Sequence, residues 1–172
     1  VAELFLGRER AAIEHLREAA GILPQLKGAS QSFLNEVRFR LGVASLRLGE
    51  TENCCLHYTP DSCLLPIPRG GVHELREGSE AAVVQFEAVL ADTPPDSRMH
   101  LSSLWLLNIA YMTLGRHPHS VPPQFLISPE AFDSDESFAR FTNIAPGLGL
   151  NTFSLSGGAV ADDLDNDGDL DL

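Results

Sequence analysis

Long apolar runs are missing from this sequence of 172 residues. No stretch approaches the roughly 18 consecutive apolar residues of a membrane-spanning helix, so we expect no membrane span. A cleavable leader with a charged start and an apolar middle is not visible either. The first residue is Val1 rather than Met, which leaves open a leader that has already been removed.

Basic residues are also few. The chain has 12 Lys and Arg against 24 Asp and Glu, for a formal net charge of −12. A surface of this sign repels the phosphates of nucleic acids and of anionic lipids. We therefore expect partners that are proteins, including other copies of this chain, and no nucleic acid.

Enzyme signatures are the third absence. The sequence contains no G-x-S-x-G, no phosphate-binding loop and no H-E-x-x-H, and residues 147–149 are only a fragment of a dinucleotide-binding glycine pattern. A Cys/His nucleophilic pair within residues 50–78 would lack a visible third group and oxyanion donors. We expect a protein that binds or assembles and is not an enzyme.

Aspartates, in contrast, crowd the end of the chain. Five of them occupy alternate positions: Asp163, Asp165, Asp167, Asp169 and Asp171. Carboxylates at this density repel one another unless a hard cation lies among them, and Ca²⁺ accepts roughly 6–8 oxygens at about 2.3–2.6 Å. We therefore predict a calcium site. The alternative is a solvated acidic tail, which would need no fixed glycine and no flanking leucines.

The spacing of these aspartates defines the kind of loop. Residues 163–168 match the D-x-D-x-D-G start of an EF-hand loop, with Gly168 at the sharp bend, but no Glu follows at the twelfth position. Asp171 instead takes the ninth position, between Leu170 and Leu172, which is a strand pattern. We expect the loop to lead into a strand rather than a helix.

The full motif, D-x-D-x-D-G-x-x-D, resembles the calcium loop between two strands of FG-GAP/VCBS repeats, the blades of integrin-type β-propellers. Upstream segments strengthen the likeness: FTNIA at 141–145, GLGL at 147–150 and SGGAVA at 156–161. The chain resembles the first propeller repeat of the cartilage acidic protein family (ASPIC/UnbV), whose bacterial members often carry tetratricopeptide (TPR) helices ahead of the propeller.

This resemblance implies a ligand set and a location. The side chains of Asp163, Asp165, Asp167 and Asp171 would bind Ca²⁺, and Asp169 would contribute its backbone carbonyl. The protein would be secreted or lie in the cell envelope, in the periplasm or on the outer surface. Because a propeller typically needs 4–8 blades and only the start of one is present, we expect the chain to be a piece of a longer protein.

A repeated pattern organises the earlier part of the chain. Ala12, Leu16, Ala19 and Pro24 recur with identical spacing as Ala82, Phe86, Val89 and Pro94. The pattern resembles the second helix of a TPR unit, in which a small residue allows close helix approach and proline ends the turn. A first-helix pattern also occurs twice, ending at Gly49 and at Gly115. We predict helices at 7–23, 32–48, 79–92 and 99–114.

The expected fold class is mainly α, with TPR-like helical hairpins followed by an irregular or β segment that opens an FG-GAP calcium-binding repeat. The expected domains are a helical domain at 1–116, a proline-rich connector at 117–140 and the start of the propeller repeat at 141–172. A Cys-containing insertion at 50–78 splits the middle hairpin. We expect the helices on either side of it to pack as one antiparallel pair, with Ala82 buried against the earlier helix.

The insertion carries all three cysteines, and two interpretations of them compete. In one, Cys63 forms a disulfide with Cys54 or Cys55, which suits an oxidising compartment and adds about 2–3 kcal/mol by chain-entropy reasoning. In the other, nitrogen and sulfur ligands suited to zinc form a metal site from Cys54, His57, Cys63 and His73. Reduced structural thiols remain a third possibility.

The family resemblance bears on this choice and on function. Members tend to keep an Asn-Cys start, a second Cys and a Gly-Gly-Val-His end here, which implies a disulfide between Cys54 and Cys63 with Cys55 as the extra thiol. The function expected is a non-catalytic, calcium-binding interaction or scaffold protein. The alternative is an enzyme-associated envelope protein with a Cys/His metal or redox site in the insertion.

Overall fold

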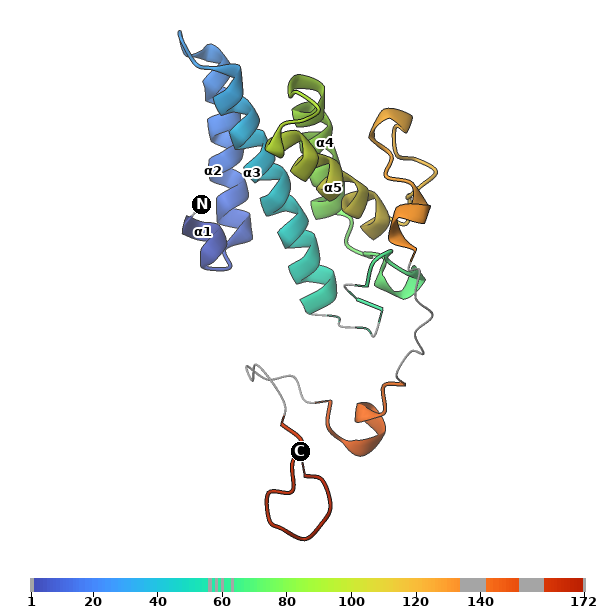
Figure 1. Ribbon diagram of the computed structural model, residues 1–172. Coiled ribbons are helices and arrows are strands. Elements are labelled where there is room, and N and C mark those ends of the chain that lie inside the picture. Colours follow the sequence, from blue (N-terminus) through green and yellow to red (C-terminus); the bar gives the residue numbers. More distant parts are fainter. Residues whose placement is uncertain are drawn as a thin grey trace. The chain divides into compact units, whose positions relative to one another are not determined.

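The computed structural model describes residues 2–55, 57, 59, 61–62, 64–133, 142–151 and 160–171. The described chain is mainly helical, as the sequence predicts (Figure 1). It divides into two compact units, residues 1–136 and 137–172. Within the described residues, the only β pairing is an isolated bridge between Asp162 and Asp171, so the predicted propeller blade stays a prediction.

Among the described residues of the first unit, four long α-helices follow a short helix α1 at Ala2–Phe5. They are α2 (Glu9–Ile22), α3 (Gln31–Glu50), α4 (Glu77–Asp92) and α5 (Arg98–Thr113), close to the predicted bounds. Serine caps two of them: the Ser30 hydroxyl accepts the Phe33 N–H at the start of α3, and the Ser97 hydroxyl accepts the His100 N–H at the start of α5.

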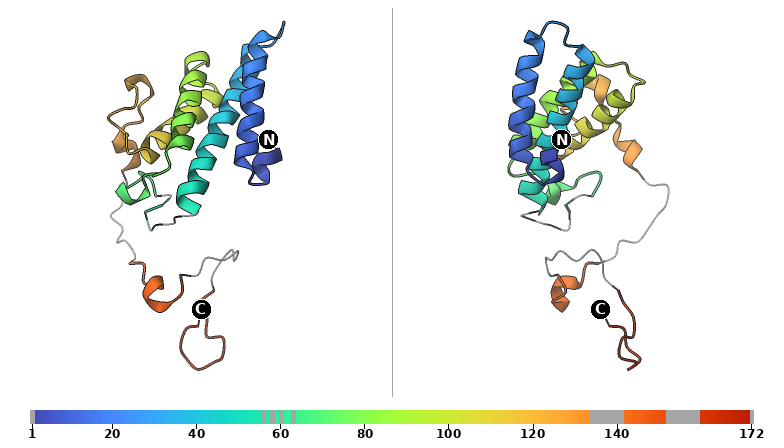
Figure 2. Two further views of the ribbon diagram at one scale, coloured as in Figure 1. Left: turned by 180° about the vertical axis from the view of Figure 1, so that it is seen from behind. Right: turned by 90° about the vertical axis from the view of Figure 1, so that its left-hand side faces the viewer.

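Helices α3 and α4 pack antiparallel although the insertion separates them in sequence. Gly49, near the end of α3, lies against Gly78 at the start of α4. Gly42, earlier in α3, lies against Phe86, later in α4. At the other end, the Gln31 side chain donates a 2.7 Å hydrogen bond to Asp92. The views of Figure 2 show α3 between α2 and α4. The predicted antiparallel pair is confirmed.

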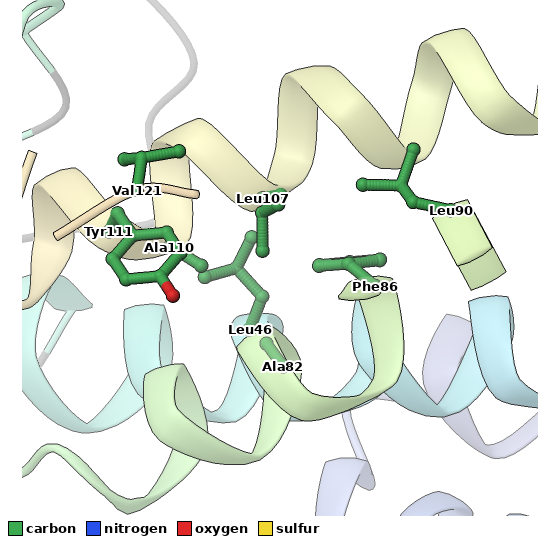
Figure 3. Packing of buried hydrophobic residues seen from close by; sticks show 8 residues of the cluster. All are labelled: Leu46, Ala82, Phe86, Leu90, Leu107, Ala110, Tyr111 and Val121. Atoms are coloured by element: carbon green, nitrogen blue, oxygen red, sulfur yellow. The ribbon is translucent and has the colours of Figure 1, made fainter. Parts of the chain in front are cut away.

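The core of this unit lies where α3, α4 and α5 meet. Ala82 and Phe86 of α4 are fully buried against Leu46 of α3 and Leu107 of α5 (Figure 3). A small side chain at Ala82 lets the helices approach, while the Phe86 ring fills the space beside it. The predicted burial of Ala82 against the earlier helix is confirmed. A second cluster joins α2 to the opposite side of α3, and it comprises Ala12, Ile13, Leu41, Ala44 and Leu48.

The described part of the predicted connector packs on α5. The Asn108 amide donates to the Phe125 carbonyl at 2.8 Å and accepts from the Ile127 N–H at 3.0 Å, so one buried side chain satisfies two backbone groups of the connector. Val121 is buried in the core cluster. Two short 3₁₀ turns occur in this part of the connector, at Pro123–Phe125 and Pro129–Phe132.

Tyr111 gives this unit a pH dependence at the alkaline end. Burial, followed by the 2.8 Å hydrogen bond that its hydroxyl donates to Glu87, raises the pKa of Tyr111 to about 12. The unfolded tyrosine ionises near pH 10. Because the folded pKa is the higher one, this contribution to stability is fully present below about pH 10 and is lost as the pH rises toward 12.

We therefore expect Tyr111→Phe to flatten the fall in unfolding free energy between about pH 10 and pH 12. At neutral pH the variant should lose about 1 kcal/mol, because Glu87 loses its hydrogen-bond donor. Urea unfolding at a series of pH values measures both effects. A variant whose alkaline fall matches that of the parent would assign the fall to other groups.

Candidate functional site

A closed loop brings the predicted calcium ligands together in the second unit. We call residues 162–171 the aspartate loop. Its ends pair, because the Asp162 N–H donates to the Asp171 carbonyl at 3.2 Å and the Asp171 N–H donates back at 2.8 Å. Asn166 (φ 60°) and Gly168 (φ 93°) adopt left-handed backbone conformations that turn the chain. The ninth position of the motif therefore lies next to the first.

Asp163 organises the interior of the aspartate loop. Its Oδ1 accepts the Asp167 N–H at 3.0 Å and its Oδ2 accepts the Gly168 N–H at 3.1 Å. Asp165 also accepts from the Asp167 N–H, at 3.2 Å, and Asp171 accepts the Leu164 N–H at 3.0 Å. Backbone N–H groups that point at carboxylates stabilise their negative charge and fix their positions.

The carboxylates gather at a spacing that suits one cation. Asp163, Asp165 and Asp171 each offer an oxygen, and these oxygens lie within 4.8 Å of one another. Two oxygens bound to the same Ca²⁺ at about 2.4 Å can be at most about 4.8 Å apart. No Lys or Arg occurs in residues 142–172 to balance the charge. These donors therefore fit a hard divalent cation, and calcium would supply the missing positive charge.

Two predicted ligands, Asp167 and Asp169, do not belong to this group of three carboxylates. Asp167 lies outside the close group of three, and its Oδ1 accepts the Asp169 N–H at 2.9 Å. Asp169 is predicted to contribute its carbonyl, and its side chain is exposed. The structure thus brings three of the five aspartates together as side-chain donors.

Asn53 closes the insertion in the first unit. Its amide nitrogen donates to the Gly49 carbonyl at 2.8 Å and to the Leu75 carbonyl at 3.0 Å. Its amide oxygen accepts the N–H groups of Glu74 and Leu75 at 2.8 and 2.9 Å. These four bonds use the full capacity of the amide, so one side chain ties the end of α3 to the segment before α4. Sequence reasoning assigned Asn53 no such role.

Cys54 and His73 meet inside this closed insertion. The Cys54 sulfur lies 3.5 Å from Nε2 of His73, and Nδ1 of the same ring lies 2.9 Å from the Ser79 hydroxyl. The backbone N–H of His73 donates to the Thr113 carbonyl at 2.8 Å. His73 is only 2% exposed, and burial lowers the pKa of its imidazole. The ring is therefore neutral and fixed at neutral pH.

The other insertion residues predicted for a metal or disulfide are placed only in part. His57 lines a pocket of about 320 Å³ together with Cys54. Within the described residues, however, Cys54, His57 and His73 do not bring three ligand atoms within 4.8 Å of one another. Cys63 lies outside the described residues, so the predicted disulfide between Cys54 and Cys63 stays a prediction. Cys55 is exposed.

Comparisons with protein-family models, with curated proteins and with solved structures found no match to this chain. None of the described helices is long and apolar enough to cross a lipid bilayer.

Proposed function

We propose that this chain is a calcium-binding interaction module, in which TPR-like helical hairpins bind protein partners and the aspartate loop binds Ca²⁺. The observation that carries the calcium part is the group of three carboxylates at Asp163, Asp165 and Asp171. Its location would be extracellular or in the cell envelope, and its role non-catalytic. The FG-GAP and ASPIC/UnbV resemblance supports the same proposal.

Calcium suits the aspartate loop better than other divalent ions. Every side chain of the loop that can ligate is a carboxylate or an amide, and these are hard oxygen donors. Zinc and copper favour imidazole nitrogen and thiolate sulfur, and residues 162–171 contain no His and no Cys. Magnesium requires near-octahedral geometry and keeps several waters, whereas calcium tolerates an irregular loop with backbone carbonyls. Binding would hold the two ends of the loop together.

The helical unit offers a surface for the binding role. A shallow hollow of about 640 Å³ is lined by apolar side chains and edged by one acidic and one basic residue: Phe39, Leu101, Trp105, Leu106, Asp96 and Arg98. Leu101 is 54% exposed and Trp105 is 42% exposed. Exposed aromatic residues beside arginine are typical of protein interfaces. Protein partners or other copies of this chain fit such a surface.

Calorimetric titration of the purified chain tests the calcium part of the proposal. We expect one Ca²⁺ per chain with a dissociation constant on the order of 10⁻⁴–10⁻³ M, the range of extracellular modules, and much weaker binding of Mg²⁺. A chain that produces no heat of binding at several times that concentration contradicts the proposal. Equal affinities for the two ions would indicate a solvated acidic segment.

A further inference from the structure

Contacts with the core helices fix the position of His73, although this residue belongs to the insertion. The ring lies against α3 and α4, because a Cβ at Gly49 of α3 would lie 3.2 Å from its Nδ1 and its partner Ser79 belongs to α4. The backbone N–H of His73 donates to the Thr113 carbonyl at the end of α5. The insertion itself is closed by Asn53, directly before Cys54. Both the imidazole and the thiol are therefore positioned by the fold.

The hydroxyls of Ser79 and Thr113 can favour the His73 tautomer in which Nε2 carries no hydrogen, as a metal ligand requires. Thr113 Oγ1 lies 2.8 Å from the Ala110 carbonyl and 2.9 Å from the Ser79 hydroxyl. The Thr113 hydroxyl is the donor to Ser79, and the second lone pair of the Ser79 oxygen can accept Nδ1–H of His73. The lone pair of Nε2 then points at the Cys54 sulfur. Metal-binding histidines commonly donate their other ring N–H to an oxygen in this way.

The distance across the pair also matches a metal. A tetrahedral zinc ion with Zn–S of about 2.3 Å and Zn–N of about 2.0 Å separates its sulfur and nitrogen ligands by about 3.5 Å. The observed separation of Cys54 Sγ and His73 Nε2 is 3.5 Å, which is also the length of a thiol–imidazole hydrogen bond, so an ion that replaces the shared proton would change this separation little. The pocket beside Cys54 would admit further ligands, since it has a volume of about 320 Å³ and His57 lines it.

We propose that Cys54 and His73 are two ligands of a thiolate–imidazole site for a transition metal ion of the zinc type. The remaining positions are open to water, or to His57, which lines the same pocket and whose side chain would have to move closer to both ligands. This site is separate from the aspartate loop and takes a different class of ion, because its donors are sulfur and nitrogen. A disulfide at Cys54 excludes it, since a disulfide sulfur is not a thiolate ligand.

The test uses two adjacent cysteines as variant and matched control. The chain is purified without chelator, and its zinc content is measured by mass spectrometry. After metal removal under a reducing agent, titration with Co²⁺ reports sulfur ligation through a thiolate charge-transfer absorption band. We expect about one equivalent of bound metal and the band in the parent and in Cys55→Ser. Cys54→Ser and His73→Gln should bind Co²⁺ at least 10-fold more weakly, and Cys54→Ser should show no band.

Further measurements separate loss of a ligand from loss of fold. Thermal melts in a chelator show whether Cys54→Ser and His73→Gln remain folded, and X-ray absorption on the metal-loaded parent counts sulfur and nitrogen neighbours directly. At least one of each supports the site. Binding by Cys54→Ser that matches the parent overturns it, as does metal-free protein in which peptide mapping finds Cys54 in a disulfide. Ser79→Ala, which keeps both ligands, should weaken binding by about 10-fold.

Discussion

Asp163→Asn is expected to reduce calcium affinity by a factor of about 100 or more, because the substitution removes a charged ligand and at least one of the charge-assisted hydrogen bonds that position it. Asp163 is the aspartate that accepts two backbone N–H groups, from Asp167 and Gly168, and it also belongs to the group of three carboxylates. Asparagine has one oxygen and carries no charge. Calorimetric titration of parent and variant measures the difference.

Asp169→Asn is the matched control for this experiment. It removes the same formal charge from the same loop, but the predicted contribution of Asp169 is its backbone carbonyl, which the substitution keeps. We expect a change in affinity of less than about 5-fold, from reduced charge alone. Asp165→Ala should behave like Asp163→Asn, because Asp165 belongs to the close group. Equal losses in Asp163→Asn and Asp169→Asn would mean that net charge, rather than coordination, holds the ion.

Gly78→Ala is expected to destabilise the helical unit by about 3 kcal/mol, at the upper end of the usual effect of overpacking. A Cβ at Gly78 would lie 2.5 Å from the Ser45 carbonyl oxygen and 2.7 Å from the Gly49 nitrogen. Both are backbone atoms of α3, so no side chain can rotate away and the two helices would have to separate. Denaturant unfolding followed by circular dichroism measures the loss.

Gly21→Ala is the control with the opposite sign. Gly21 lies in α2, and nothing lies within 4 Å of the Cβ that the substitution would add. Alanine is a better helix former than glycine by up to about 1 kcal/mol, so this variant should be as stable as the parent or slightly more so. If Gly78→Ala leaves stability unchanged, the close antiparallel contact of α3 and α4 is wrong.

The helical part of the fold could be predicted because its pattern repeats. The shared spacing of Ala12 and Ala82 with their large apolar neighbours located two helices, and burial of Ala82 followed from the need for close approach. Trp105 shows the limit of such reasoning, since an aromatic at helical spacing predicts core. It is 42% exposed, because its face of α5 borders the shallow hollow. Phe132 covers only part of the ring, at 5.6 Å between ring centroids.

The contacts within the insertion were harder to predict, because they join residues that are distant in the sequence and meet only in the folded chain. No apolar period links Cys54 to His73, and their approach is set by the hydrogen bonds of Asn53 and by Ser79 on α4. The sequence could name both residues as candidate ligands but could not choose between a metal and a disulfide.

The aspartate loop could be predicted less fully than the helices but better than the insertion. Alternate spacing predicted the ligands, and three of the predicted residues form the close group, whereas Asp167 lies outside it and accepts the Asp169 N–H. Short acidic side chains commonly bond to backbone N–H groups two residues on, and the motif alone does not show which carboxylates of the loop come together.

A crystal structure of the chain grown in calcium tests the central claim most directly. Anomalous scattering locates the ion independently of the surrounding protein atoms. We predict one calcium peak in the aspartate loop, at about 2.3–2.6 Å from carboxylate oxygens of Asp163, Asp165 and Asp171. A map without a peak at this position, with the three carboxylates turned toward solvent, would contradict the assignment of the loop as a calcium site.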